Sequence, residues 1–469
     1  MRVDIEVLNP IWSRCTSDLK IIAPCLSYPS TVWVHAQSGK RPKTFDQCIM
    51  KKNGMFYTGW IPKLEHFCKK HGYRFQVTFS NEHRKICANV KPTCEPILPP
   101  NGNFKCLRPD QERQIKAAIK GRRGVIVAPM GLGKTILALA IMKAFSGFNI
   151  LFLCPNLSIL TKTIQDLKNF GFKQFCQLGD GQKHITDKIV VATMQTMRNM
   201  PLDELTLHFD VILIDEMHIA MEEFQTYEKI LGSLAAPIRL GFTATAPKQK
   251  EQALISEGLL GPIIDKIDFE EAFDMGLIVK PTVSMILLPK FEGINSNNYQ
   301  KVFNKAIVSN KARNRWISRL AEEMVNEGRK VLIFSTTQNT EHGHLIQKAV
   351  ANSGLKIEYV YGDISAVRRE DIINDLTDGY LDCVIADKVW REGVNIPSVN
   401  GIIMAASGKG EEEQGENGVI QFVGRGTRKH DGKIDLKVYD FFDPYRYVAE
   451  HSIERVGAYT RSGFEVKIR

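Results

Sequence analysis

The chain has 469 residues and a formal net charge of +10, and 43% of its residues are hydrophobic. This composition is that of a soluble globular protein of two or three domains, and it excludes a disordered or fibrous chain. No apolar run approaches the roughly 20 residues of a membrane span. Asp4 and Glu6 stand where a signal peptide would be apolar. We expect a cytoplasmic protein without a membrane partner.

The positive charge is concentrated at the N-terminus. Residues 1–100 contain fifteen Lys and Arg against seven Asp and Glu, a net of +8. Such a basic region predicts a polyanionic partner, most simply nucleic acid, and charge that only serves solubility is the alternative. Residues 31–34 and 73–79 predict half-buried strands, and 62–71 predict a helix. A small α+β domain is therefore expected, ending in the Pro-rich linker 91–103.

Two features of this basic region have competing interpretations. Trp12, Trp33 and Trp60 could stack on unpaired bases, but packing in the core or on the surface is the more common fate of a tryptophan. Seven of the ten cysteines lie between Cys15 and Cys106. Their spacing fits no common zinc pattern, so reduced thiols are expected and a zinc site is the alternative.

The stretch Ala128–Thr135 carries the clearest chemical signal. It reads Ala-Pro-Met-Gly-Leu-Gly-Lys-Thr and lies between an apolar run at 124–127 and a helix-like run at 136–145. A phosphate-binding loop needs this strand–loop–helix context. Its backbone N–H groups and the helix N-terminus would hold phosphate oxygens. Lys134 would reach the β- and γ-phosphates, and the Thr135 hydroxyl would bind Mg²⁺.

Short apolar runs alternate with helical stretches before and after residue 280. They lie at 150–154, 188–192, 211–214 and 239–242, and then at 331–334, 357–360, 383–386, 401–404 and 437–440. This alternation predicts two α/β domains with parallel, doubly wound sheets. The predicted parts are a basic nucleic-acid-binding domain at 1–103, α/β domains at 104–265 and 283–445, a linker at 266–282 and a C-terminal tail at 446–469.

Two adjacent acids, Asp215 and Glu216, follow the run at 211–214. They should lie at the carboxyl edge of a parallel strand, where such sheets bind ligands. Asp215 is predicted to hold Mg²⁺, and Glu216 to orient and deprotonate an attacking water. An acidic turn without catalytic function is the alternative, which the upstream phosphate loop disfavours.

The motif Asp215-Glu216-Met217-His218 resembles that of superfamily 2 helicases and translocases of the DExH type. Further segments resemble motifs of this family in order and spacing: Leu107–Gln111, Cys154–Asn156, Ala192–Gln195, Thr243–Ala246, Val384–Pro397 and Gln421–Arg428. The resemblance covers residues 104–445. It implies two tandem RecA-like domains after the small α+β domain, with ATP and Mg²⁺ as cofactors.

The resemblance also implies a role for each matching residue. ATP would be bound by Arg108, Gln111, Met130, Gly131, Leu132, Gly133, Lys134, Thr135 and Gly393, and Mg²⁺ by Thr135 and Asp215. Catalysis would need Glu216, Gln421, Arg425 and Arg428, with the two arginines acting as fingers on the γ-phosphate across a cleft between the domains. His218, Thr243 and Thr245 would couple hydrolysis to movement. Pro155, Thr193, Ser335 and Lys388 would contact nucleic acid.

One position departs from the family pattern. Asp387 stands where the family commonly has a threonine on a nucleic-acid phosphate. A carboxylate there would repel a phosphate, so this contact is not carried over, and Lys388 is expected to substitute or Asp387 to point away.

A narrower resemblance is to UvsW-type phage helicases. It is carried by Arg428–Lys433, Asp440–Asp443 and Asn310–Ile317, and by Gly59–Tyr73 in the basic region. It implies a phage-encoded motor, in the host cytoplasm, that contacts DNA through its backbone. Such a motor remodels forks, Holliday junctions and R-loops in recombination, repair and replication, with other phage proteins of these processes as partners. An RNA helicase or ribonucleoprotein remodeller, and an ATP-dependent clamp without unwinding, are the alternatives.

Overall fold

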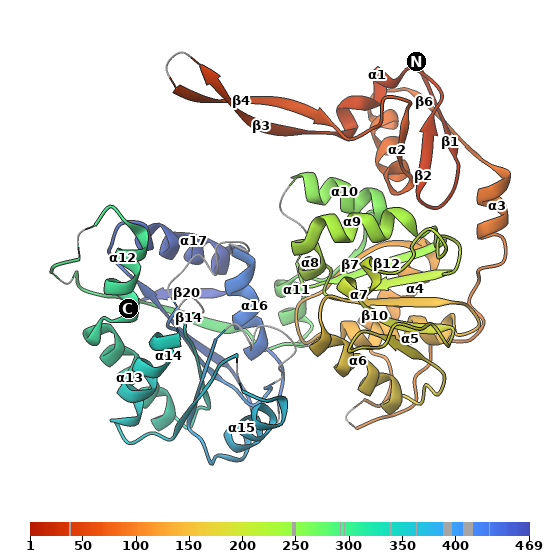
Figure 1. The fold of residues 1–469 in the computed structure, drawn as a ribbon. Coiled ribbons are helices and arrows are strands. Elements are labelled where there is room, and N and C mark those ends of the chain that lie inside the picture. Colours follow the sequence, from red (N-terminus) through yellow and green to blue (C-terminus); the bar gives the residue numbers. More distant parts are fainter. Residues whose placement is uncertain are drawn as a thin grey trace. The chain divides into compact units, whose positions relative to one another are not determined.

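The structure is a computed structural model that describes residues 1–36, 39–102, 104–245, 250–290, 292–294, 296–336, 340–362, 364–387, 396–406, 416–430 and 432–469 (Figure 1). The chain divides into two compact units. Unit 1 comprises Met1–Ala128 and Gly133–Lys266, and unit 2 comprises Ile267–Arg469 together with Pro129–Leu132. Each unit contains a seven-stranded parallel sheet, so the predicted tandem α/β architecture is confirmed.

The N-terminal part of unit 1 is a small α+β region, as predicted. Its four-stranded sheet has the order β5–β2–β1–β6, in which β1 pairs antiparallel with β2 and parallel with β6. Strands β3 and β4 form a separate antiparallel ribbon that extends away from this sheet (Figure 1). The elements are β1 (Arg2–Val7), β2 (Trp12–Cys15), α1 (Leu19–Ile22), η1 (Ala23–Leu26), β3 (Ser27–Ala36), β4 (Gly39–Cys48), β5 (Met55–Tyr57), η2 (Thr58–Trp60), α2 (Ile61–Lys70), β6 (Arg74–Phe79) and α3 (Asn81–Cys87).

This region shares a hydrophobic core with the first parallel sheet. Trp60 is fully buried, and its indole N–H donates a 2.6 Å hydrogen bond to the carbonyl of Leu254. A Cβ at Gly258 would lie 2.6 Å from the Trp60 ring, so the backbone there approaches the indole as closely as only glycine permits. Tyr57 donates a 2.7 Å hydrogen bond to Glu228. The two parts of unit 1 are therefore packed together rather than joined by a free linker.

The first parallel sheet has the strand order β13–β7–β12–β11–β8–β10–β9. Its elements are α4 (Pro109–Gly121), β7 (Arg123–Val127), α5 (Lys134–Ala144), β8 (Ile150–Cys154), α6 (Leu157–Asn169), β9 (Cys176–Leu178), β10 (Ile189–Thr193), α7 (Met194–Arg198), β11 (Val211–Ile214), α8 (Met217–Ala220), η3 (Met221–Glu223), α9 (Phe224–Ser233), β12 (Ile238–Thr243), α10 (Lys250–Leu260) and β13 (Ile263–Lys266).

The central strands of this sheet are buried on both faces. Leu151 and Leu153 of β8 pack into one hydrophobic cluster with α9, α10 and the N-terminal region. Phe152, between them, packs into a second cluster with α4, α5 and α6. Because helices cover both faces, the strand sequence is a continuous apolar run, which explains why the sequence revealed it.

The second parallel sheet, in unit 2, has the order β16–β17–β15–β18–β19–β14–β20. Its elements are α11 (Phe269–Asp274), β14 (Pro281–Leu287), α12 (Tyr299–Phe303), the π-helical turn η4 (Asn304–Val308), α13 (Lys311–Asn326), β15 (Val331–Phe334), α14 (Thr340–Ala351), β16 (Ile357–Val360), α15 (Ala366–Asp378), β17 (Cys383–Ala386), β18 (Gly401–Met404), α16 (Glu416–Gly426), β19 (Leu436–Phe442), α17 (Val448–Arg461) and β20 (Glu465–Ile468). The last two elements lie in the predicted tail, and β20 pairs with β14.

Two buried ion pairs hold the last part of unit 2 to its sheet. Arg313 of α13 pairs with Asp443 at 3.0 Å, and both side chains are fully buried. Arg455 of α17 pairs with Asp440 at 2.8 Å, and the Tyr459 hydroxyl donates to the same carboxylate. Removing one partner of such a pair typically costs about 3–5 kcal/mol, because the other charge remains buried. No helix among the described residues is long and apolar enough to cross a bilayer.

Candidate ATP site and motor residues

The predicted phosphate loop connects β7 to α5. Gly131 and Gly133 have φ angles of +87° and +82°, which L side chains rarely adopt. A Cβ at Gly133 would lie 2.7 Å from the side-chain amide nitrogen of Gln111. Glycine is therefore required here for both conformation and space. The loop leads into the N-terminus of α5, whose backbone N–H groups suit an anion, so these residues fit the phosphates of ATP.

Lys134, the first residue of α5, is 7% exposed. Its ammonium donates to the carbonyl of Ala128 at 3.3 Å and lies 3.8 Å from Oε1 of Glu216. The ammonium is thus positioned between the two ends of the loop region and the end of β11. A phosphate oxygen is the kind of group that such a preorganised cation binds.

Asp215 follows β11 and is buried. Burial, together with the neighbouring Glu216, raises the pKa of its carboxyl group to about 6, although Lys134 acts in the opposite direction. A divalent cation beside this carboxylate would offset the cost of burying it. Asp215 and the half-buried Thr135 therefore fit the predicted Mg²⁺ site. Bound Mg²⁺ supplies neutralisation of phosphate charge.

Glu216 has a φ angle of +42°, in the left-handed region. Its backbone N–H donates to Oδ1 of Asp215 at 2.9 Å. Such a conformation costs a non-glycine residue roughly 1–3 kcal/mol and is typical of functional sites. Here it turns the Glu216 carboxylate toward Lys134, next to the phosphate loop, where a base for the attacking water is needed.

The predicted coupling residues lie beside the same loop. The Ala128 N–H donates a 3.0 Å hydrogen bond to the carbonyl of Thr243, at the end of β12. The Thr243 hydroxyl donates to the Thr245 carbonyl at 2.8 Å, which closes a tight turn. A change in the loop is therefore transmitted directly to this turn. The His218 side chain lies outside the described residues.

The residues expected to contact the adenine stand at the start of α4. Arg108 forms a two-point ion pair with Asp110, at 2.9 and 2.8 Å. Gln111 is 2% exposed, and its carbonyl oxygen accepts from the Arg108 N–H at 3.1 Å while its amide nitrogen lies against Gly133. The structure thus brings Gln111 to the phosphate loop. Met130 and Leu132, also predicted to bind ATP, are buried.

The two nucleic-acid contacts predicted in unit 1 lie at the carboxyl ends of β8 and β10, which are adjacent strands. Pro155 precedes α6 and is half-buried. Thr193 is 4% exposed, and its hydroxyl accepts from the Thr196 N–H as the N-cap of α7 and donates to the Thr196 hydroxyl. The Thr193 hydroxyl therefore also has a structural role.

Ser335 follows β15 in unit 2 and is 4% exposed. Its backbone N–H donates to the Ala386 carbonyl at 2.9 Å, which places it beside Asp387 at the carboxyl edge of the sheet. The pairing of β15 with β17 accounts for this proximity. Lys388 and Gly393, predicted to contact nucleic acid and ATP, lie outside the described residues.

The predicted arginine fingers stand at the end of α16. Arg425 is 8% exposed, and Arg428 pairs through its backbone with Ile278. Lys433 donates to the Gly426 carbonyl, the last of α16, and to the carbonyls of Pro397 and Val399. Sequence reasoning missed this cap, although a lysine just after a helix C-terminus is a usable signal. The Gln421 side chain lies outside the described residues.

The tryptophans and cysteines of the N-terminal region have mainly structural surroundings. Trp60 is part of the core, and half-buried Trp12 stacks on Tyr57 with ring centroids 4.7 Å apart. The Trp33 side chain lies outside the described residues. All ten cysteines are free. In the part of the chain that the structure describes, no three His, Cys, Asp or Glu side chains are grouped so as to hold a metal ion.

Two family models match the chain. Residues 104–248 match the Type III restriction enzyme res subunit, and residues 313–430 match the helicase conserved C-terminal domain. Together they span the two parallel sheets and nearly all of the motif residues described above.

Individual relatives extend the similarity. The ATP-dependent DNA helicase uvsW of Enterobacteria phage T4 is 20% identical over 89% of this chain and 88% of its own. The DNA 3'-5' translocase XPB2 of Sulfurisphaera tokodaii is 24% identical over 69% of this chain and 79% of its own. A solved fragment assigned to the HsdR subunit of a type I restriction enzyme from Vibrio vulnificus YJ016 covers 94% of this chain and 91% of its own, with 14% identity and a TM-score of 0.56.

Proposed function

Since the chain is a superfamily 2 helicase that resembles UvsW, we propose that it is an ATP-driven motor that remodels branched DNA. Its substrates on this proposal are forks, Holliday junctions and R-loops, and its biological setting is phage recombination, repair and replication. The matching domains and relatives support ATP-dependent DNA helicase activity. The narrower substrate class is supported by the similarity to a phage helicase over 89% of the chain.

The observation that carries the proposal is the arrangement of Lys134, Asp215 and Glu216. The ammonium of Lys134 lies 3.8 Å from the Glu216 carboxylate, and the buried Asp215 carboxylate immediately precedes it. On this proposal Lys134 holds the transferred phosphate and Glu216 accepts the proton of the attacking water. Arg425 and Arg428 meet the negative charge that develops in the transition state. An intact set of these groups disfavours a clamp that binds ATP without hydrolysing it.

We propose that residues 1–103 bind the DNA backbone, that 104–265 and 283–445 are the motor domains joined by 266–282, and that 446–469 completes the second domain. Phosphate contacts supply affinity without sequence information. The exposed Lys69 and Lys70 in the last turn of α2 are suitable backbone contacts. Because Trp60 belongs to the core of unit 1, these lysines, rather than a truncation, are the appropriate sites for a test.

The experiment that tests this function compares ATP hydrolysis and strand displacement on single-stranded, duplex, forked, four-way and RNA–DNA substrates, with a double-stranded RNA of equal length as the control. The proposal predicts the greatest stimulation on the branched DNA substrates. Stimulation that is greatest on RNA would replace it with the RNA-helicase alternative. Equal ATP hydrolysis with and without nucleic acid would contradict a motor of either kind.

A further inference from the structure

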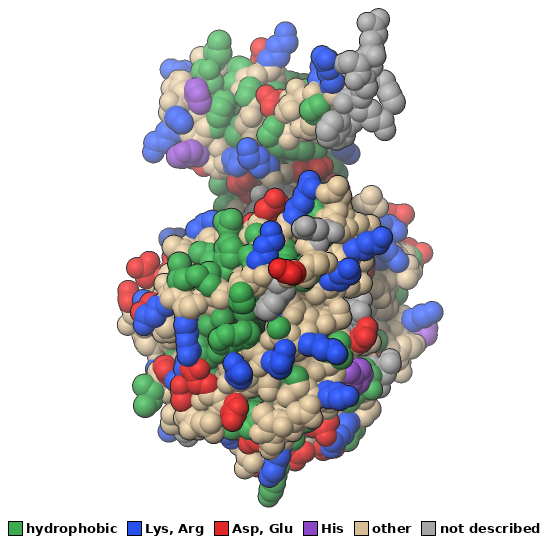
Figure 2. Space-filling model, turned by 90° about the vertical axis from the view of Figure 1, so that its left-hand side faces the viewer, with side chains coloured by type: hydrophobic (Ala, Val, Ile, Leu, Met, Phe, Trp, Pro, Cys, Tyr) green, Lys and Arg blue, Asp and Glu red, His purple; other side chains and the backbone are tan. Residues whose placement is uncertain are grey.

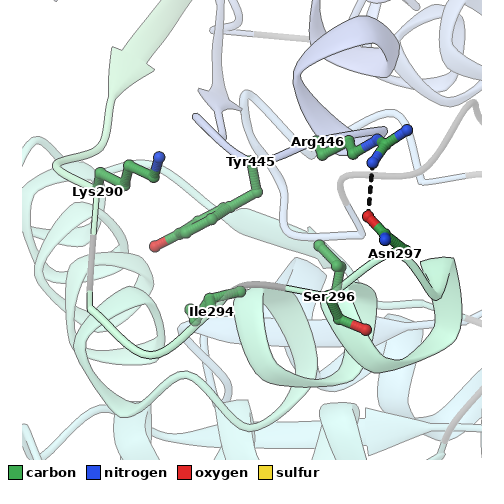
Figure 3. A pocket seen from close by; sticks show the side chains of 7 residues that line it. Lys290, Ile294, Ser296, Asn297, Tyr445 and Arg446 are labelled. Carbon is green, nitrogen blue, oxygen red and sulfur yellow. Dashed lines mark hydrogen bonds between the residues drawn. The ribbon is translucent and has the colours of Figure 1, made fainter.

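A cavity of about 400 Å³ in unit 2 is lined by residues that none of the motifs includes. This volume lies within the range of small-molecule sites, about 300–1,000 Å³. Three segments build it: Lys290 after β14, a stretch leading into α12, and the turn between β19 and α17. The described lining residues are Lys290, Ile294, Ser296, Asn297, Val302, Tyr445 and Arg446 (Figure 3).

One side of the cavity is cationic, with Lys290 and Arg446. Arg446 donates a 2.6 Å hydrogen bond to the side-chain oxygen of Asn297 and stacks on the Tyr447 ring, with 5.1 Å between the guanidinium carbon and the ring centroid. The Tyr447 hydroxyl in turn donates to the Asn297 carbonyl at 3.0 Å. The guanidinium is therefore held in place while four of its five N–H donors remain for an anion.

The backbone at this turn is strained. Tyr447 has a φ angle of +70°, which is rare for a bulky side chain. Residues in such conformations cost about 1–3 kcal/mol and cluster at ligand-binding sites. Here the conformation brings the Tyr447 ring under Arg446 and its hydroxyl to Asn297, so the strain has a clear structural result.

The other side of the cavity is apolar and aromatic. Tyr445 and Val302 are 3% and 2% exposed and belong to one hydrophobic cluster, against which Ile294 packs. Figure 3 shows the Tyr445 ring pointing into the space between Lys290 and Ile294. An aromatic ring fixed in this way provides a surface on which a nucleobase can stack.

The charge of the lining selects the class of ligand. On the face drawn in Figure 2, Lys and Arg side chains are interspersed with Asp and Glu. By contrast, none of the described residues that line the cavity is acidic. The cavity thus suits an anion that also carries a flat apolar group, and it does not suit a cation or an amine.

We propose that this cavity binds one nucleotide, with its phosphate between Lys290 and Arg446 and its base against Tyr445. The ligand is an unpaired nucleotide of a DNA strand or a free nucleoside phosphate, which share this chemistry. The cavity lies at the carboxyl ends of the parallel strands β14 and β19, the same sheet edge that holds Ser335 after β15. This location favours the DNA strand. The site goes beyond the proposed function, because neither ATP hydrolysis nor backbone contact requires it.

The test uses the full-length protein and photochemical crosslinking. One probe is a single-stranded oligodeoxynucleotide with a single 5-iodouracil, and the other is free 5-iododeoxyuridine monophosphate. Adducts are mapped by mass spectrometry in the wild type, in the double variant Lys290→Ala/Arg446→Ala, and in Lys356→Ala. Lys356 is an exposed control at the opposite, amino edge of the same sheet, just before β16. Because all three substituted side chains are exposed, the variants should fold, which circular dichroism checks.

The proposal predicts an adduct on the peptide that contains Tyr445, reduced at least tenfold in the double variant and unchanged in Lys356→Ala. An adduct from the oligonucleotide identifies a DNA strand as the source, and one from the monophosphate alone identifies a free nucleotide. The double variant should also flatten the salt dependence of oligonucleotide binding by up to about 0.7 in logarithmic slope for each contact. Absence of an adduct at Tyr445 with both probes, or equal yields in the double variant, would overturn the proposal.

Discussion

The ammonium of Lys134 in the phosphate loop lies 3.8 Å from Oε1 of Glu216, at the end of β11. The two residues are far apart in the sequence, and the parallel order of β7, β12 and β11 brings them to one edge of the sheet. Lys134 is nearly buried, so this ion pair is only weakly screened by solvent. The pair therefore positions both groups for a phosphate that would lie between the loop and the strand end.

Substitutions at this pair should separate binding from chemistry. Glu216→Gln keeps the shape and removes the base, so we expect ATP binding to persist and the turnover number to fall by about 10²–10⁴. Lys134→Ala should abolish both tight ATP binding and hydrolysis. Lys143→Ala, at an exposed position on the same helix α5, is the control and should match the wild type. Undiminished hydrolysis by Glu216→Gln would remove Glu216 from its proposed role.

The arginines at the end of α16 should act on the transition state. Arg425→Ala and Arg428→Ala are each expected to reduce turnover by about 10³–10⁵ while nucleotide affinity stays within a few-fold of the wild type. Arg368→Ala, which removes a surface arginine paired with Glu358 in the same unit, is the matched control. A variant that weakens ATP binding but turns over normally when saturated would show that its arginine is not a finger.

The packing of Trp60 between the N-terminal region and α10 should contribute strongly to stability. Trp60→Ala removes a fully buried side chain and its hydrogen bond to Leu254, so we expect unit 1 to lose about 3–5 kcal/mol of unfolding free energy. Trp316→Ala, at a position 38% exposed on α13, is the matched control and should cost less than about 1 kcal/mol. Urea denaturation followed by tryptophan fluorescence and circular dichroism measures both. Similar losses in the two variants would argue against a shared core.

The buried His342 should make unit 2 sensitive to acid. Burial, with the nearby charge of Arg313, lowers the pKa of His342 to about 3. The unfolded chain therefore takes up this proton as the pH falls below about 6.5, whereas the folded protein does not, so stability is present above that pH and is lost below it. Between pH 7.5 and 5.5 the loss from this one group is about 1.4 kcal/mol.

The His342→Gln variant tests this assignment. It should reduce the difference in unfolding free energy between the two pH values by that amount, whatever it does to stability at pH 7.5. His344→Gln, on the exposed side of the same helix α14, is the control. If His342→Gln retains the full difference, the acid sensitivity comes from other groups.

The sequence predicted those parts of the fold that have a strong periodic pattern. Strands such as Ile150–Cys154 and Val331–Phe334 are buried on both faces and appear as uninterrupted apolar runs. The edge strands β13 and β20 were not predicted, because their side chains are largely exposed and lack such a pattern. β14 was missed as well, since it starts at a proline and alternates in burial.

The same distinction applies to the functional residues. The phosphate loop and the Asp215–Glu216 pair were predictable, because their chemistry constrains both residue types and spacing. The Tyr445–Arg446 cavity was not, because its residues come from separate segments that only the fold brings together. Two of the stretches that suggested the phage family instead form the buried Arg313–Asp443 and Arg455–Asp440 pairs, which are structural. Resemblance in those stretches therefore reports the fold more directly than the substrate.

The most direct test of the central claim follows a synthetic four-way DNA junction as it is converted to forked duplex products. The conversion is measured with ATP, without ATP, and with the Glu216→Gln variant in the presence of ATP. We predict conversion by the wild type with ATP only, at a rate that falls with that variant's loss of hydrolysis. Conversion at the same rate without ATP or by Glu216→Gln, or intact junctions despite rapid junction-stimulated hydrolysis by the wild type, would contradict an ATP-driven motor for branched DNA.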